Sequence, residues 1–198
     1  MESMELKHKE DNLPILFFKT ANEWQAWLGK NHATSKGAWL RIYKKDSGVP
    51  SIDRSQSLDA ALCYGWIDGQ ANKYDEESYL QRYSPRRPKS IWSKKNIENI
   101  ARLTAAKKMK PAGMKEVEAA KADGRWEAAY DSPANMEIPK DFLKELAKNA
   151  KAKEFFKTLN KTNTFSIGWR LQTAKKPETR EKRMKVIIEM LAKGQKFH

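Results

Sequence analysis

The sequence predicts an α+β protein, in which a small antiparallel sheet with packed helices is followed by an all-helical C-terminal region. Three observations support this fold class. Apolar and polar residues alternate in the first half of the chain, which is the period of a half-buried strand. From Ser93 onward, apolar residues recur about every three or four positions, which is the period of a helix face. Turn residues separate these segments along the whole chain.

The first half contains the expected strands. Residues 13–18 form a short apolar run typical of a strand, and Thr20 followed by Glu23 is a capping-box pattern that begins a helix over residues 21–31. Pro85 ends the last strand, because proline cannot donate to a sheet ladder. The other elements expected here are a strand over 37–45, a short helix over 57–64, and a hairpin of strands over 66–73 and 78–84.

Helices dominate the second half. Ser93 and Pro111 are residue types favoured at helix starts, so a helix is expected to begin at each. The stretch 130–139 is rich in turn residues and predicts a linker. Further helices are expected near 139–148, 150–158, 163–174 and 177–193. The predicted organisation is a flexible leader over 1–12, an α+β domain over 13–130 and a helical domain over 138–198.

Length and composition indicate a folded protein with unevenly distributed charge. A chain of 198 residues can bury a full core, and 39% hydrophobic residues exclude a disordered chain. The formal net charge is +14. Residues 93–198 hold 25 Lys/Arg against 13 Asp/Glu, whereas residues 1–92 hold 14 against 12. Such a basic half favours anionic partners, and it is also typical of a solvated lysine-rich surface.

The cysteine content and the hydropathy indicate a cytoplasmic protein. Cys63 is the single cysteine, which excludes an internal disulfide and fits a reducing cytosol. Residues 1–12 lack the apolar core of a signal peptide. No window approaches the roughly 18 apolar residues that a transmembrane helix needs. We therefore expect a soluble protein without a transmembrane segment.

A candidate anion-binding site lies where the last expected strand turns into a helix. The stretch "QRYSPRRPKSIWSKKN", residues 81–96, contains three arginines and three lysines. The N–H groups at the start of a helix favour an anion, and arginine can hold a phosphate or carboxylate with two donors. In the alternative interpretation, Arg82 pairs across the hairpin with Asp68 or Glu77, and the other two arginines lie in solvent. The predicted anion-binding residues are Trp66, Arg82, Arg86, Arg87, Trp92, Ser93 and Lys94.

Asp68 is a candidate acid/base residue. It alternates with Trp66 and Gln70 on one strand, so the three side chains share a face and would place a carboxylate beside a stacking surface. This pattern would suit an enzyme acting on an anionic small molecule, with the arginines as substrate clamps. A half-exposed strand face with a salt bridge has the same pattern, so both interpretations stay open.

A second basic surface is predicted at the start of the last helix. Apolar residues form the core stripe of this helix and leave cations near its start. Arg180 and Arg183 are three positions apart and so share a helix face. Alternatively, Glu178 and Glu181 neutralise these cations locally. The predicted partner surface comprises Lys175, Lys176, Arg180 and Arg183.

The sequence argues against several kinds of site. Cys63 lies among small apolar residues, where a buried thiol is expected, and no histidine is placed to activate it. His8, His32 and His198 form no metal-ligand pair. Neither GxGxxG nor a P-loop pattern occurs, so neither a cofactor nor a metal is predicted. Zinc-finger, RNP and KH signatures are also missing, which does not favour nucleic acid as a partner.

Five motifs in order resemble those of the YdeI/OmpD-associated family, also called the OmdA or bacteriocin-protection family. They are "GWIDGQ" (65–70), "QRYSPRRPKSIWSKKN" (81–96), "MKPAG" (109–113), "AKADGRWEAAYD" (120–131) and "AKKPETREKRMKVIIEMLAKG" (174–194). The resemblance runs from about Phe18 to the C-terminus, and the part from about Ile138 is similar to the OmdA domain. One departure is "TFSIGWRLQTAKK", where relatives tend to have a run like "YVxWIxxAKK".

The resemblance implies a bacterial, cytoplasmic protein connected with protection against bacteriocins or envelope stress and with an outer-membrane porin. It transfers no catalytic residues. Together with the basic sites, it predicts a non-enzymatic protection protein that binds an anionic small molecule or an acidic protein surface. The alternatives are an enzyme that uses Asp68, and binding of nucleic acid or a membrane surface through the basic C-terminal helices.

Overall fold

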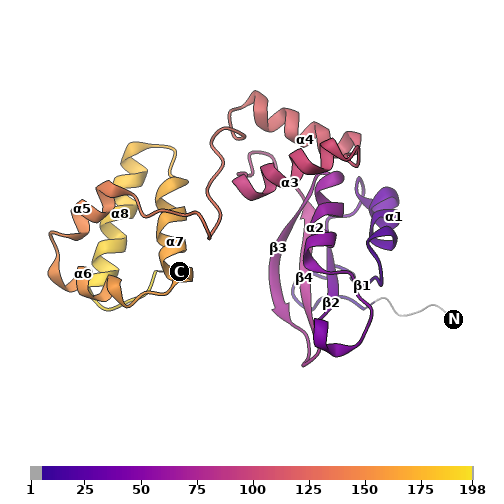
Figure 1. Ribbon diagram of the computed structural model, residues 1–198, viewed down its shortest axis with the longest axis horizontal. Coiled ribbons are helices and arrows are strands. Elements are labelled where there is room, and N and C mark those ends of the chain that lie inside the picture. Colours follow the sequence, from indigo (N-terminus) through magenta and orange to yellow (C-terminus); the bar gives the residue numbers. More distant parts are fainter. Residues whose placement is uncertain (1–5, 198) are drawn as a thin grey trace. The chain divides into compact units, whose positions relative to one another are not determined.

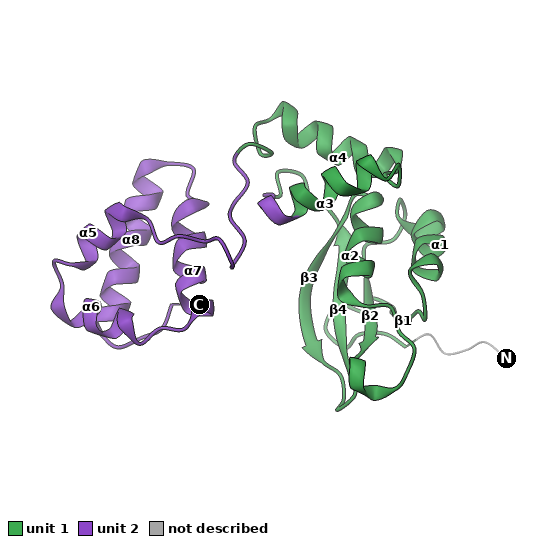
Figure 2. Cartoon of the chain, in the orientation of Figure 1, with its two compact units in different colours: residues 1–90, 96–127 green, residues 91–95, 128–198 purple. Residues whose placement is uncertain are grey.

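The computed structural model of the protein describes residues 6–197 (Figure 1), which form two compact units (Figure 2). Unit 1 contains the chain up to Ser90 together with Asn96–Glu127, and unit 2 contains Ile91–Lys95 together with the chain from Ala128 onward. The described residues contain a four-stranded sheet followed by helices, which confirms the α+β class. No helix within residues 6–197 is long and apolar enough to cross a membrane.

The sheet of unit 1 is mixed, whereas the sequence predicted an antiparallel one. Its order is β1-β2-β4-β3, with β2–β4 and β3–β4 antiparallel and β1 parallel to β2. The helix α1 (Ala21–Asn31) explains the parallel pair, because it carries the chain from the end of β1 back to the start of β2. The strands are β1 (Ile15–Phe17), β2 (Ala38–Tyr43), β3 (Trp66–Lys73) and β4 (Ser78–Pro85).

Helices α1 and α2 (Arg54–Cys63) cover one face of this sheet (Figure 1). The Thr20 side chain accepts a hydrogen bond from the Glu23 N–H, so the predicted cap of α1 is confirmed. Asp53 caps α2 in the same way, which starts this helix earlier than the predicted residue 57. The core beneath the two helices consists of Trp24, Leu28, Leu40, Ile42, Ile52, Ala60, Ala61, Trp66 and Tyr83.

Helix α4 (Pro111–Ala122) packs very closely against the end of α2, and the motif "MKPAG" explains why. Pro111 begins the helix, and the Lys110 N–H donates to the Cys63 carbonyl oxygen at 3.1 Å. A Cβ atom on Gly113 would lie 2.4 Å from that same carbonyl oxygen, closer than any real contact. Only glycine permits this approach. The remaining helical segments of this part of the chain are α3 (Lys94–Ala105) and the 3₁₀ turn η1 (Lys45–Ser47).

The predicted leader over 1–12 lies partly outside the described residues, which begin at residue 6. Its second half lies against the sheet. The His8 ring stacks on the Trp39 ring at a centroid distance of 4.2 Å, and Trp39 Nε1 donates to Asp11 Oδ1 at 3.1 Å. These contacts cover part of the sheet face opposite to α1 and α2.

Unit 2 contains helices at the positions predicted for the C-terminal region. Asn149 and Asn160 cap α6 and α7, Pro177 opens α8, and Gly194 follows its end with φ +70°. The helices are α5 (Lys140–Leu146), α6 (Ala150–Lys157), α7 (Lys161–Gln172) and α8 (Pro177–Ala192). Their shared core consists of Phe142, Leu146, Ala152, Ile167, Leu171, Met184, Ile187 and Leu191.

Candidate anion-binding site

Arg82 of the predicted arginine site pairs with the N-terminal segment. Its Nε donates to Asp11 Oδ2 at 3.1 Å, so the pair that the alternative interpretation placed across the hairpin does not form. Burial would raise the pKa of Asp11, but hydrogen bonds from Trp39 and Arg82 outweigh this effect and lower it. Arg82 therefore fastens residues 6–14 to the sheet.

Arg86 is built into the protein, contrary to the alternative that placed it in solvent, while Arg87 is exposed. Arg86 and Arg125 are both only 7% exposed. Arg86 Nη1 donates to Ser90 Oγ at 3.1 Å, and Arg125 Nη1 donates to the Ser90 carbonyl oxygen at 3.0 Å. Arg125 Nε also pairs with Asp123 at 2.7 Å. Two buried guanidinium groups thus brace one turn.

The predicted tryptophan walls are core residues. Trp66 and Trp92 are each 1% exposed, and Trp66 Nε1 donates to the His32 carbonyl oxygen at 3.1 Å. Trp92, Ser93 and Lys94 belong to unit 2, whereas Trp66 and the three arginines belong to unit 1. No single unit contains all seven residues, so the predicted arginine site stays a prediction.

Within unit 2, the start of α3 is held to the segment after residue 127. Ser93 forms a parallel bridge with Tyr130, and Lys94 Nζ pairs with Asp131 Oδ1 at 2.6 Å. Hydrogen bonds from Lys94 and Gln172 lower the pKa of Asp131. Lys94 therefore serves an ion pair within unit 2.

Asp68 forms the salt bridge of the alternative interpretation, but with a different arginine. Arg54 Nη2 lies 3.0 Å from Asp68 Oδ2. The register of β3 shifts between Asp68 and Ala71, so the alternation expected to bring Gln70 onto the same face is interrupted. The role of Asp68 as an acid/base residue stays a prediction.

The other chemical groups of unit 1 have structural surroundings. Cys63 is 2% exposed, and burial raises the pKa of its thiol, which keeps it protonated, as expected for a core cysteine. Within residues 6–197, no group of three or more His, Cys, Asp or Glu side chains is arranged to hold a metal ion.

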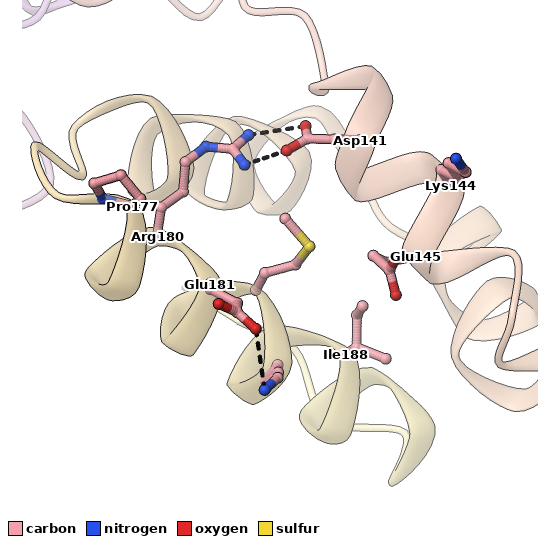
Figure 3. A pocket seen from close by; sticks show the side chains of 9 residues that line it. Asp141, Lys144, Glu145, Pro177, Arg180, Glu181 and Ile188 are labelled. Atoms are coloured by element: carbon pink, nitrogen blue, oxygen red, sulfur yellow. Dashed lines mark hydrogen bonds and ion pairs between the residues drawn. The ribbon is translucent and has the colours of Figure 1, made fainter.

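One side of α8 forms a groove of about 560 Å³ with α5, whose lining holds three acids and three bases, four of them in two ion pairs (Figure 3). Met184 and Ile188 line this α5/α8 groove between the charged residues. Arg180 donates two hydrogen bonds to Asp141, which lowers the pKa of Asp141. Glu181, which also lines this groove, pairs with Lys185 at 3.2 Å. The charges of this side largely neutralise one another.

The other side of α8 forms a smaller pocket of about 260 Å³ with α7, the α7/α8 pocket. Its lining contains three cations and no carboxylate: Arg170, Thr179, Lys182, Arg183, Val186 and Phe197. Arg183 Nη1 donates to the Arg170 carbonyl oxygen at 2.8 Å, which holds its guanidinium group at the pocket. The Arg170 guanidinium lies over the Phe197 ring at 5.9 Å.

The cations of the α7/α8 pocket have no ion pair with any carboxylate that the structure describes. Lys182 also borders a shallow depression along α8 that carries three glutamates, but none of them lies within ion-pair distance. Arg170 and Arg183 do not border that depression. Positive charge is therefore concentrated at this pocket.

The structure divides the predicted basic partner surface. Arg180 lines the α5/α8 groove and Arg183 lines the α7/α8 pocket, although the sequence predicted that they act together. Lys175 and Lys176 are exposed in the segment between α7 and α8. Sequence reasoning missed Arg170 and Phe197, because they lie on another helix and beyond the end of α8. Their contact arises only from tertiary packing.

Two family models match the chain. "Domain of unknown function (DUF8412)" matches residues 16–116, and "Bacteriocin-protection, YdeI or OmpD-Associated" (OmdA) matches residues 135–194. The OmdA match covers α5 to α8, which is narrower than the resemblance that the sequence motifs suggested. No curated protein and no solved structure matches the chain. The chain therefore belongs to the DUF8412 family through its first half and carries the bacteriocin-protection, YdeI or OmpD-associated domain in unit 2.

Proposed function

We propose that this is a bacterial, cytoplasmic protein of the bacteriocin-protection type that binds an anionic partner in the α7/α8 pocket. The observation that carries the proposal is the division of charge on α8. Toward α5, Arg180 and Lys185 each have a carboxylate partner. Toward α7, Arg170, Lys182 and Arg183 have none among the described residues.

Unpaired cations around a depression attract an anion more strongly than the same cations in ion pairs. A guanidinium group has five N–H donors, and Arg183 donates from Nη1 to a backbone carbonyl oxygen. The remaining donors stay available for a phosphate or carboxylate, and hydrogen bonds of this charged kind are about twice as strong as neutral ones. Because the carbonyl holds the side chain in place, less conformational entropy is lost on binding.

The pocket lies mostly within the OmdA match, in a region with a basic excess. Residues 128–198 hold 16 Lys/Arg against 8 Asp/Glu. The enzyme alternative lacks comparable support, because Asp68 is paired with Arg54 and lines neither the groove nor the pocket beside α8. We therefore favour a binding protein.

A thermal-shift screen of the full chain tests the proposal. The probes are phosphate, sulfate, nucleotides, sugar phosphates and carboxylates, each added to the protein and to Lys182→Gln/Arg183→Gln. A probe present at about 100 times its dissociation constant should stabilise the protein by about 2.7 kcal/mol. We expect at least one probe to raise the midpoint and the double variant to lose that shift.

The matched control is Lys151→Gln/Lys153→Gln, which removes the same charge from exposed positions on α6. It should keep the full shift. If no anion shifts the midpoint, or if both double variants lose it equally, the proposal is wrong. In the second case, affinity that falls steeply with salt would instead indicate a polyanion held by the whole basic surface.

A further inference from the structure

We infer that the α7/α8 pocket selects an anion attached to an apolar body, namely a phosphate monoester or carboxylate of a ring or short alkyl group, over an inorganic anion. The inference rests on the proposed function and concerns the ligand class of the same site. It follows from the apolar part of the pocket lining, which the proposed function does not use.

Two apolar side chains stand beside the cations. Val186 is 43% exposed, so a large part of its apolar side chain faces solvent. It lies three and four positions after Arg183 and Lys182, so it shares their face of α8. Phe197 approaches from beyond the end of the helix and lies under the Arg170 guanidinium at 5.9 Å. The cationic and apolar walls therefore adjoin each other.

The size of the pocket fits a compact ligand with two chemical parts. A cavity of roughly 150 Å³ is enough to hold benzene. The α7/α8 pocket has about 260 Å³, which leaves room for one ring and one anionic group. Inorganic phosphate would satisfy the cations but leave Val186 and the uncovered part of the Phe197 ring in contact with water. A ligand that covers them gains the free energy of apolar burial in addition.

The distribution of polar groups also restricts the ligand. The lining includes Arg170, Lys182, Arg183 and the hydroxyl of Thr179, which can all donate hydrogen bonds, while no carboxylate is present to accept them. A neutral ring would bury cations without compensation, which is unfavourable. The pocket therefore requires both the anion and the apolar body.

Isothermal titration calorimetry on the full chain at about 50 mM salt, where screening is modest, tests this inference. The probes are inorganic phosphate, phenyl phosphate, benzoate and benzyl alcohol. We expect phenyl phosphate or benzoate to bind on the order of tenfold more tightly than phosphate, as burial of a few apolar carbons provides. Benzyl alcohol should give no measurable binding. The ratio of phenyl phosphate to benzoate identifies the preferred anion.

Variants separate the two walls of the pocket. Val186→Ala should lower the affinity for phenyl phosphate and leave the affinity for inorganic phosphate unchanged. Arg183→Gln should lower both affinities by on the order of tenfold or more. Val49→Ala, at a similarly exposed valine of unit 1, and Lys151→Gln are the matched controls and should have no effect.

Each failure has a distinct meaning. If inorganic phosphate binds as tightly as the two aromatic anions, the inference about the apolar body is overturned while anion binding itself stands. If phenyl phosphate binds and its affinity is the same for Arg183→Gln, the ligand binds elsewhere and the inference is wrong. If none of the anionic probes binds, this inference fails, and the wider anion screen decides separately on the proposed function.

Discussion

Arg125 in unit 1 and Arg183 in unit 2 both donate to a backbone carbonyl oxygen, yet the remainder of their surroundings differs. Arg125 is 7% exposed and also holds Asp123, so its charge is used inside the protein. Arg183 lines a pocket without a carboxylate. The difference shows that an arginine held by a backbone carbonyl oxygen does not by itself indicate an anion site. What matters is whether a carboxylate also pairs with it, as Asp123 does with Arg125.

In unit 1, Gly113 allows two helices to pack closely, and its replacement gives the largest predicted effect on stability. Gly113→Ala should destabilise the protein by about 3 kcal/mol, at the upper end for overpacking, because its Cβ would meet the Cys63 carbonyl oxygen at 2.4 Å. Gly29→Ala is the matched control at an exposed position of α1, where the new Cβ makes an ordinary 3.5 Å contact. There, the better helix propensity of alanine should stabilise by up to about 1 kcal/mol.

Urea unfolding of both glycine variants measures these opposite signs. Equal effects of the two substitutions would contradict the close packing of α2 against α4.

Exchanging each of the two compared arginines for glutamine tests the contrast directly. Arg125→Gln should lower the free energy of unfolding by about 2 kcal/mol, because it breaks hydrogen bonds to a carboxylate and to the Ser90 carbonyl. Arg183→Gln should change stability by less than about 0.5 kcal/mol, as surface substitutions do, and should weaken anion binding instead. Chemical denaturation measures the stability of both variants, and calorimetry measures their anion binding. The contrast breaks down if the two variants lose stability alike.

Adding a carboxylate should convert the α7/α8 pocket into the kind of surface found on the other side of α8. Thr179→Glu places an acid in the first turn of α8, where it also complements the helix dipole. Anion affinity should fall on the order of tenfold, about 1.4 kcal/mol, while stability stays equal or rises slightly. Thr179→Gln should keep the affinity. Calorimetry with phenyl phosphate compares the two, and equal binding by both would show that the pocket is not the site.

The Asp141–Arg180 pair should give the smallest effect, because both side chains are partly exposed. Arg180 lowers the pKa of Asp141, so the stabilisation is fully present above the unfolded-state pKa, about 3.9, and is lost as the pH falls through the lower folded-state pKa. Asp141→Asn should cost less than about 1 kcal/mol near pH 6, and nothing at a pH below the folded-state pKa.

Denaturation curves at several pH values follow this change, with Glu189→Gln as a control at an exposed carboxylate of the same helix bundle. A difference between the protein and Asp141→Asn that does not depend on pH would mean that the ion pair contributes nothing.

Local signals in the sequence predicted the helix ends well. Thr20, Pro177 and Gly194 act where expected, because a cap depends on residues three or four positions apart. The prediction of an antiparallel sheet was wrong at β1, which is parallel to β2, because the direction of pairing depends on how the chain returns through α1. The partner of Arg82 was also missed, since Asp11 lies 71 positions away.

The sequence by itself determined the fold class, the helix caps, the buried cysteine and the basic second half, because composition and short-range spacing specify them. Only the tertiary structure decided which cations are neutralised. Arg180 and Arg183 lie three positions apart on the same helix, yet α5 brings Asp141 to one, while α7 and the segment after α8 bring Arg170 and Phe197 to the other. Ion pairs and pockets depend on distances of a few ångströms between segments far apart in the chain, and those distances are set by packing of the core.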